Sequence, residues 1–308
     1  MKPFRFALQG RAVEPQAWRD TARRAEDLGY STLYVPDHFD VDSAWSPIVA
    51  LTVAAETTST LEVGSLVLGN DYRHPAIAAK EFATLALASG GRAVFGLGAG
   101  WLRTDYEELG LPYDEPAVRV DRLAEAIAVA KGCFSPGPFT FEGEHYSITN
   151  YDAKPDLERV PPILIGGGGR RVLSLAAREA DIVGINPNLR AGAIGVDAAH
   201  SGMRAETDQK VAWVREAAGE RIDEIELQIR YFLAAVTDDK HGLAASVAPM
   251  FEVDPEEALD SGVALAGTVD DICDQLVERR ERWGVSNVVF GADQADEFAP
   301  VVSRLAGT

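Results

Sequence analysis

The chain has 308 residues, of which 46% are hydrophobic and 25% are charged, a composition typical of a soluble globular fold. The formal net charge of −19 argues against a nucleic-acid or anionic-membrane surface, so we expect neither partner. No run approaches the roughly 20 apolar residues that span a bilayer, and the first residues lack a signal peptide's apolar run. We therefore expect a cytoplasmic protein that acts on a small molecule.

Apolar runs recur at the spacing of parallel strand–helix units. The first four begin near Phe4, Thr32, Val63 and Ala93, at intervals of 28, 31 and 30 residues. Such a unit needs about 30 residues. Four more candidate strands cover residues 163–165, 181–185, 226–233 and 287–290. The pattern predicts a (β/α)8 TIM barrel spanning 1–308 as a single domain, with an open doubly wound sheet as the alternative.

Helices and insertions follow the same rhythm. Gly29 ends a helical pattern that includes Trp18, and Pro75 and Pro116 suit the first turns of two others. We expect insertions after the fourth, sixth and seventh strand units. Residues 133–162 predict an inserted hairpin, whereas 186–207 and 238–266 read as irregular.

Two short segments after early strands carry candidate reactive groups, because active sites of such barrels lie at the carboxyl ends of the strands. Asp37 and His38 follow the second strand, and a histidine can exchange a proton near neutral pH. A helix cap or a structural histidine is an equally weighted alternative. The third strand runs from Ser65 through Leu66 and Leu68 to Asn70, where an ordinary turn is the favoured alternative to a special backbone.

Two glycine-rich segments suggest close approach of a ligand. Gly98, Ala99, Gly100 and Trp101 follow the fourth strand, although tight barrel packing explains these glycines equally well. After the fifth strand, Gly166–Gly169 leads into a helix that begins at Arg170. Backbone N–H groups at a helix start, next to arginine, favour phosphate.

Other chemistries have little support in the sequence. The five histidines are scattered, so no metal site is predicted, and no Gly-x-Ser-x-Gly elbow occurs. The two cysteines, Cys133 and Cys273, lie far apart, and we expect buried thiols.

The segments in this order resemble the bacterial luciferase-like superfamily and, more narrowly, its deazaflavin (coenzyme F420)-dependent oxidoreductases. The resemblance rests on LGYSTLYVPDHF, VGSLVLGNDYRHPAIAAKEFATLALASGGR, FGLGAGW, FEGEHYSI, PPILIGGGGRRVLSLAAREADIVGI and ALAGTVDDICDQLVERRERWGVSNVVF. It implies an enzyme that transfers a hydride between F420 and a small organic substrate.

The resemblance also implies roles for individual residues. Asp37 and His38 match the pair that faces the deazaflavin ring, with His38 handling the proton. A non-proline cis peptide is implied in the third strand, with Ser65–Leu66 as the first choice. Trp101 stands where sugar-phosphate dehydrogenase relatives carry an acid, which implies a more apolar pocket. The implied cofactor-binding residues are Ser65, Leu66, Leu68, Asn70, Gly98, Ala99, Gly100, Trp101, Gly166, Gly167, Gly168, Gly169 and Arg170.

Three other functions remain open at this point. A luciferase-like monooxygenase of the same superfamily would use FMN instead of F420. A sugar-phosphate isomerase or aldolase would need a lysine or glutamate at a strand end, and such residues are sparse. A binding protein without turnover is the third. Family members are often dimers, and the apolar helix near residues 76–87 is a candidate homodimer interface.

Overall fold

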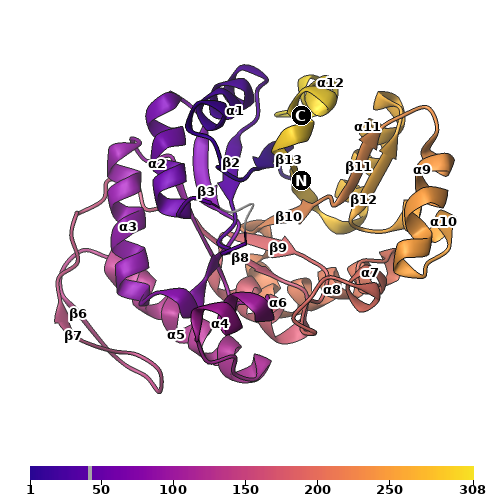
Figure 1. Ribbon diagram of the computed structural model, residues 1–308. Helices are drawn as coiled ribbons and strands as arrows, with labels where there is room; N and C mark the ends of the chain where they lie inside the picture. The colour runs from indigo at the N-terminus through magenta and orange to yellow at the C-terminus, as the bar shows by residue number, and fades with distance from the viewer. Residues whose placement is uncertain (41–43) are drawn as a thin grey trace.

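The computed structural model describes residues 1–40 and 44–308, and its parallel strands close into a barrel (Figure 1). The order β3-β2-β1-β13-β10-β9-β8-β5 is closed by pairing of β3 with β5, which excludes the open sheet and confirms the TIM barrel. The barrel strands are β1 (Arg5–Gln9), β2 (Thr32–Val35), β3 (Glu62–Ser65), β5 (Ala93–Gly98), β8 (Ile163–Gly167), β9 (Ile182–Ile185), β10 (Glu226–Arg230) and β13 (Val285–Gly291).

Alternating residues of these strands fill two separate cores. Ala7, Tyr34 and Val94 point into the barrel, where they pack with Leu164 and Val289. Their neighbours in sequence face the surrounding helices and belong to the larger core. Because both faces are buried, the strands appear in the sequence as continuous apolar runs.

Helices cover the outside of the barrel (Figure 1). They are α1 (Pro15–Asp27), α2 (Pro47–Thr57), α3 (Pro75–Ala88), α5 (Pro116–Phe134), α6 (Arg170–Glu179), α8 (Arg204–Ala218), α11 (Val269–Trp283) and α12 (Ala295–Leu305). A short helix, α4 (Arg103–Leu109), lies in the connection between β5 and α5. Pro75 and Pro116 stand in the first turns of α3 and α5, as predicted. None of the helices in the described residues is long and apolar enough to cross a membrane. Cys133 and Cys273 are buried free thiols, as expected.

The third strand position is interrupted. β3 ends at Ser65, and β4 (Leu68–Gly69) continues the position and pairs with β5. The non-proline cis peptide lies at Leu66–Val67, so the choice of Ser65–Leu66 is wrong by one residue. The Leu66 N–H donates to the Val35 carbonyl at 3.0 Å, which keeps the Ser65–Leu66 peptide in the ladder with β2. The residues around this position form one apolar run, so the sequence does not indicate which peptide bond interrupts the hydrogen bonding of the strand.

The hairpin predicted within residues 133–162 is confirmed, whereas the two segments expected to be irregular contain regular elements. Residues 133–162 include an antiparallel hairpin of β6 (Phe139–Glu142) and β7 (Ser147–Tyr151). The supposedly irregular segments contain α7 (Val196–His200), α9 (Lys240–Val247), α10 (Pro255–Asp260) and β12 (Ala264–Gly267). Helices of eight residues or fewer show too little periodicity to be recognised.

The predicted strand over 226–233 is also divided. β10 ends at Arg230, and β11 (Leu233–Val236) begins a separate parallel pair with β12, outside the barrel (Figure 1). The apolar character continues across this break, so hydrophobicity alone does not locate it.

Candidate active site

A cavity of about 1350 Å³ opens at the carboxyl ends of the barrel strands. Typical ligand pockets measure roughly 300–1,000 Å³, so there is room for a cofactor and a substrate. The four segments picked out in the sequence converge here, as predicted. The candidate residues that line the cavity are Asp37, His38, Leu66, Leu68, Gly98, Ala99, Gly100, Trp101, Gly166, Gly167, Gly168, Gly169 and Arg170.

His38 is held by a buried carboxylate that the sequence analysis missed. Its Nδ1 lies 2.7 Å from Oδ2 of Asp105, in α4. The same carboxylate accepts hydrogen bonds from the Tyr72 hydroxyl at 3.0 Å and the Phe39 N–H at 3.2 Å. Burial and the neighbouring Asp105 raise the pKa of Tyr72, so its hydroxyl stays a donor. Because Asp105 accepts from Nδ1, the other ring nitrogen, Nε2, remains for proton exchange.

Asp37 is occupied by protein partners. Its carboxylate accepts from Arg73 at 2.6 and 3.2 Å, and from the Gly69 N–H at 3.1 Å. These bonds fix the chain just after the interrupted third strand. Asp37 therefore supports β4, and its expected part in catalysis stays a prediction.

Ser65 and Asn70 do not line the cavity, in contrast to their expected place among the cofactor contacts. The Ser65 hydroxyl is buried and donates to the Gly96 carbonyl at 2.8 Å, between β3 and β5. Asn70 instead borders a second, smaller hollow, and its side-chain amide donates to the Tyr146 hydroxyl at 3.3 Å. Ser65 therefore links β3 to β5, and Asn70 links the segment after β4 to Tyr146.

Most of the predicted glycines are needed for packing. A Cβ on Gly98 would lie 2.6 Å from Val67, and one on Gly168 would lie 2.2 Å from the Pro187 carbonyl oxygen. Gly100 has a φ of +75° and would clash with the Tyr106 hydroxyl. Gly169 is different, because the nearest atom to a Cβ there is 3.9 Å away. It precedes α6, whose first turn has no side-chain cap.

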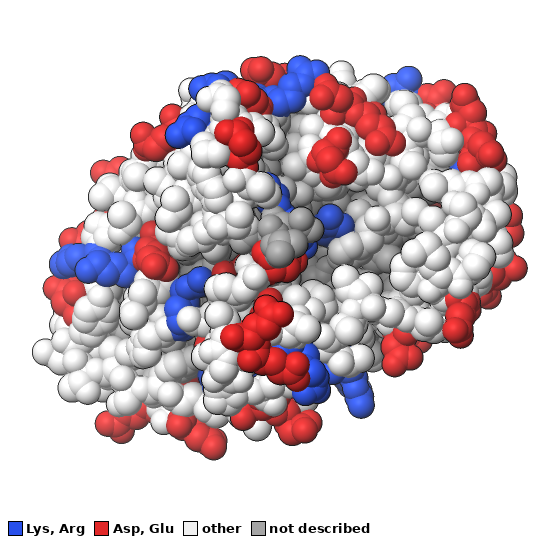
Figure 2. Space-filling view, viewed as in Figure 1, with Lys and Arg blue, Asp and Glu red and all other residues white. Residues whose placement is uncertain are grey.

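The cavity is basic although the protein is acidic. Its described lining includes six arginines, at positions 11, 119, 170, 171, 190 and 230, against two aspartates, at 37 and 293. Figure 2 shows blue side chains at the central hollow, on a face whose rim carries many red ones. A local positive field of this kind admits an anionic ligand despite the overall charge.

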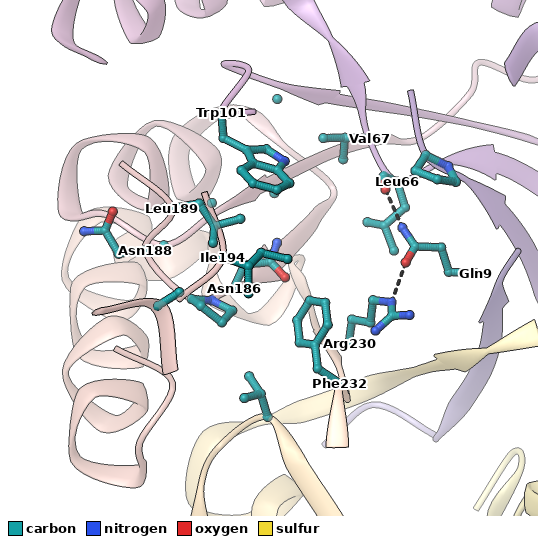
Figure 3. Close-up of a pocket in the computed structure, with 18 of the residues that line it drawn as sticks. Gln9, Leu66, Val67, Trp101, Asn186, Asn188, Leu189, Ile194, Arg230 and Phe232 are labelled. Atoms are coloured by element: carbon teal, nitrogen blue, oxygen red, sulfur yellow. Dashed lines mark hydrogen bonds between the residues drawn. The ribbon is translucent and has the colours of Figure 1, made fainter. Parts of the chain in front are cut away.

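Other lining residues were not anticipated. Gln9 at the end of β1 donates to the Leu66 carbonyl at 2.7 Å, and Arg230 donates to the Gln9 side-chain oxygen (Figure 3). Asn186, which follows β9, also lines the cavity. Gln9 and Asn186 stand at or just after a predicted strand end, so their position was the available signal. Arg230 lay inside the predicted strand 226–233, and only the observed end of β10 places it at the cavity.

Known proteins share this architecture. The chain is 34% identical over 188 residues to an F420-dependent glucose-6-phosphate dehydrogenase from Kineococcus radiotolerans, covering 58% of this chain and 56% of the relative. It is 28% identical to an FMNH2-dependent dimethylsulfone monooxygenase from Pseudomonas fluorescens, covering 65% and 50%. The chain thus spans about half the length of these curated relatives.

The fold likeness extends over the whole chain. The solved structure of the coenzyme F420-dependent tetrahydromethanopterin reductase from Methanopyrus kandleri superposes with a TM-score of 0.78 at 20% identity, covering 99% of both chains. The family model described as luciferase-like monooxygenase matches residues 2–287. On this match, the chain belongs to the luciferase-like monooxygenase family.

Proposed function

We propose that this protein is an F420-dependent oxidoreductase that transfers a hydride between the deazaflavin and a small organic substrate. The observation that carries the proposal is His38, held by Asp105 through Nδ1 at the wall of a large basic cavity. The relative named as an F420-dependent glucose-6-phosphate dehydrogenase supports the choice of cofactor.

The residues present fit a flat, anionic cofactor. Leu66 and Val67, at the break in the third strand, offer an apolar surface on one side of the cavity (Figure 3). The open first turn of α6 after Gly169 would hold a phosphate, since its N–H groups have no side-chain cap. Arg170 stands at the same turn, where it pairs with Glu216 at 3.1 Å and is largely exposed. It would add positive charge from the rim.

When bound, the cofactor supplies the hydride chemistry, and the protein supplies position and proton handling. His38 would accept a proton from an alcohol, or give one to a reduced double bond, through Nε2. Asp105 would keep the ring in one orientation and stabilise its protonated form. Trp101 contacts the His38 ring edge-on, with centroids 5.4 Å apart, and would help keep water from this nitrogen.

An FMN-dependent monooxygenase is the second candidate, favoured by the likeness to the dimethylsulfone monooxygenase. Titration of the purified protein with F420 and with FMN, followed by fluorescence quenching, separates the two. We expect micromolar binding of F420 and at least tenfold weaker binding of FMN. Binding of FMN alone, or of neither cofactor, would reject the proposal.

Gly169→Asp provides a matched test of the phosphate site. The space around Gly169 is open, and aspartate is a favourable residue before a helix. The variant should therefore fold at least as well as the wild type. Its carboxylate would occupy the N–H groups of α6 and repel a phosphate, so F420 affinity should fall at least tenfold. Unchanged affinity would place the phosphate elsewhere.

A homodimer through α2 and α3 is part of the proposal. The two helices pack side by side and leave Val49, Ile77 and Leu87 exposed. Apolar residues on neighbouring helices favour an interface, although scattered ones are common on monomers. Light scattering of the wild type should give twice the mass of the chain, and Ile77→Glu should give the monomer. A monomeric wild type at micromolar concentration would reject this part.

A further inference from the structure

Arg230 has unused hydrogen-bond donors that face the cavity. It ends β10, and its Nε donates to Gln9, which in turn donates to the Leu66 carbonyl (Figure 3). These two bonds fix the orientation of the guanidinium group. Within residues 1–40 and 44–308, its Nη1 and Nη2 atoms have no protein acceptor. Two parallel N–H donors on a fixed plane are therefore available to a ligand.

Arg230 makes no ion pair with the described residues, although Asp293 lies nearby. Burial lowers the pKa of Arg230, the nearby Asp293 opposes this effect, and Arg11 adds to it. Among the described residues, no carboxylate lies within ion-pair distance of the Arg230 guanidinium. A half-buried charge of this kind gains most from an acceptor that a ligand brings.

Large apolar side chains stand exposed in the same cavity. Phe232 is 52% exposed, Ile194 is 65% exposed and Met250 is 71% exposed, yet all three line it. The Arg230 guanidinium lies over the Phe232 ring, 4.5 Å from its centroid.

Figure 3 shows apolar and polar residues on different sides of the hollow. One side is surrounded by Trp101, Leu189, Ile194 and Phe232, and the other is bounded by Arg230 and Gln9. Exposed apolar groups gathered at one cavity mark the place of an apolar ligand.

We propose that Arg230 binds the carboxylate of a substrate whose body is apolar, an aliphatic or aromatic monocarboxylate. A single fixed guanidinium matches the planar, singly charged carboxylate through two parallel hydrogen bonds. Phe232, Ile194 and Met250 contact the apolar body. The site is separate from the proposed phosphate site, since Arg230 follows β10 and Gly169 follows β8. The identification of this ligand as the hydride partner rests on the proposed function; its binding does not.

Octanoate and octanamide provide matched probes, because they share a chain length and differ in charge. Calorimetric titrations of the F420-saturated protein, and of the cofactor-free protein, are made at one pH and ionic strength. We expect octanoate to bind about ten- to a hundredfold more tightly than octanamide, the range of a hydrogen bond to a charged group. Arg230→Gln should reduce this preference below twofold, and Arg230→Lys should retain part of it.

Arg190→Gln is the control, because Arg190 is another arginine of the same cavity, on the loop after β9. It should keep the preference for octanoate. Thermal melting of each variant shows whether it is folded. The proposal is overturned if wild type shows no preference, if Arg230→Gln keeps it, or if Arg190→Gln removes it equally.

The outcomes separate this inference from the proposed function. If F420 does not bind to the wild type, but the octanoate preference is present in the cofactor-free protein and vanishes in Arg230→Gln, the cofactor assignment fails and the carboxylate site stands. If Arg230→Gln abolishes F420 binding and leaves the octanoate preference intact, Arg230 serves the cofactor and the carboxylate site is wrong.

Discussion

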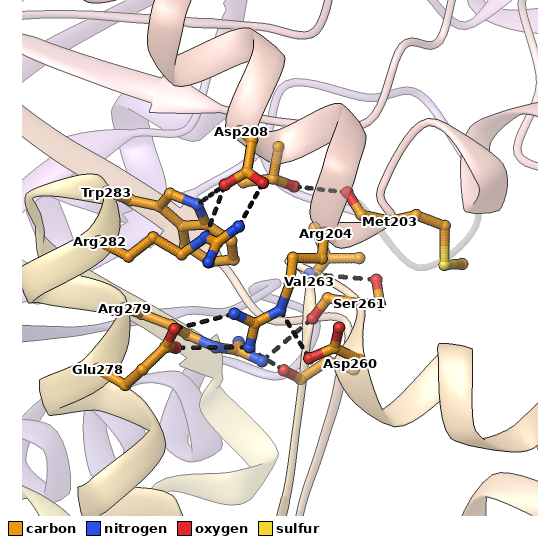
Figure 4. A network of polar contacts seen from close by, with 12 residues as sticks. Met203, Arg204, Asp208, Asp260, Ser261, Val263, Glu278, Arg279, Arg282 and Trp283 are labelled. Carbon is orange, nitrogen blue, oxygen red and sulfur yellow. Dashed lines mark hydrogen bonds and ion pairs between the residues drawn. The ribbon is translucent and has the colours of Figure 1, made fainter.

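Two walls of the cavity are built on different physical principles. The strand-end wall, formed by residues 66–69, 98–101 and 166–168, is held by backbone approach and by glycines that leave little or no room for a Cβ. The insertion wall, residues 231–266, lies outside the barrel and is anchored through long polar side chains (Figure 4). The first wall is recognisable in sequence, because few positions in a fold require glycine and glycine-rich segments after strands therefore stand out. The second is not, because charged residues occur everywhere on a surface.

The anchor of the insertion wall is a set of arginines on α8 and α11. Arg279 is buried and donates to the carbonyls of Ala264 at 2.6 Å and Ser261 at 3.1 Å. Arg204 reaches Asp260 at 2.6 Å and Glu278 at 2.9 Å (Figure 4). The insertion is therefore fixed by hydrogen bonds that a few substitutions can remove, in contrast to the apolar packing of the barrel.

The largest effect should come from the strand-end side of the cavity. His38→Gln removes the proposed proton carrier and keeps the size and polarity of the side chain. We expect turnover to fall about 10²–10⁴-fold, the usual contribution of a general acid or base. F420 affinity, measured by fluorescence quenching, should stay within threefold. Turnover within tenfold of the wild type would assign His38 a structural role.

The next effect concerns the insertion wall. Arg279→Met leaves the carbonyls of Ser261 and Ala264 without their donor, so the free energy of unfolding should fall by about 2–4 kcal/mol. Urea titration measures this loss. Hydrogen exchange should locate it in β11 and β12.

Arg282→Gln is the matched control for that change. Arg282 pairs with Asp208 on the surface, with 43% of its side chain exposed, so its loss should cost under about 1 kcal/mol. Equal losses in the free energy of unfolding for the two variants would show that Arg279 stabilises the insertion wall no more than a surface arginine does.

Asp105 should give a smaller effect on turnover, because it acts through His38. Asp105→Asn retains the shape and replaces a charged acceptor with a neutral one. We expect turnover to fall about tenfold to a hundredfold, the range of one hydrogen bond to a charged group, with unchanged F420 affinity. Asp105→Glu should recover part of the activity. Loss of cofactor affinity in both variants would indicate a collapsed loop instead of a misplaced histidine.

The sequence predicted the barrel and most of the strand-end wall, because buried parallel strands and glycine-rich strand ends have local signatures. Asp105 escaped prediction because it lies 67 residues from His38, and nothing local distinguishes it from other acids. Gln9 and Arg230 escaped for the same reason, since their contact joins residues 221 apart. The ion pair between Asp37 and Arg73 also depends on tertiary geometry. Contacts between distant residues decide the chemistry of the site, and only the fold reveals them.

The smallest expected effect concerns a helix that covers the barrel, and it tests whether single polar contacts stabilise this part of the molecule too. Glu26, near the end of α1, accepts hydrogen bonds from the N–H groups of Ser59, Thr60 and Leu61 at 2.6–3.0 Å. Burial alone would raise the pKa of Glu26, but these N–H donors outweigh it and lower the pKa to about 2. The folded pKa lies below the usual value of 4.5, so the carboxylate stabilises the fold fully above pH 4.5 and loses this contribution as the pH falls through about 2.

Glu26→Gln should therefore lower the free energy of unfolding by about 1 kcal/mol at pH 7, a modest loss because the group is partly exposed. The difference from the wild type should shrink between pH 4.5 and pH 2, where the wild-type carboxylate takes up its proton. Urea titrations at pH 7, 4 and 2.5 measure it. Asp27→Asn, one residue away and on the exposed side of the helix, should change stability by less than about 0.5 kcal/mol at every pH. A pH-independent loss in Glu26→Gln would mean that the side chain acts by packing and not through its charge.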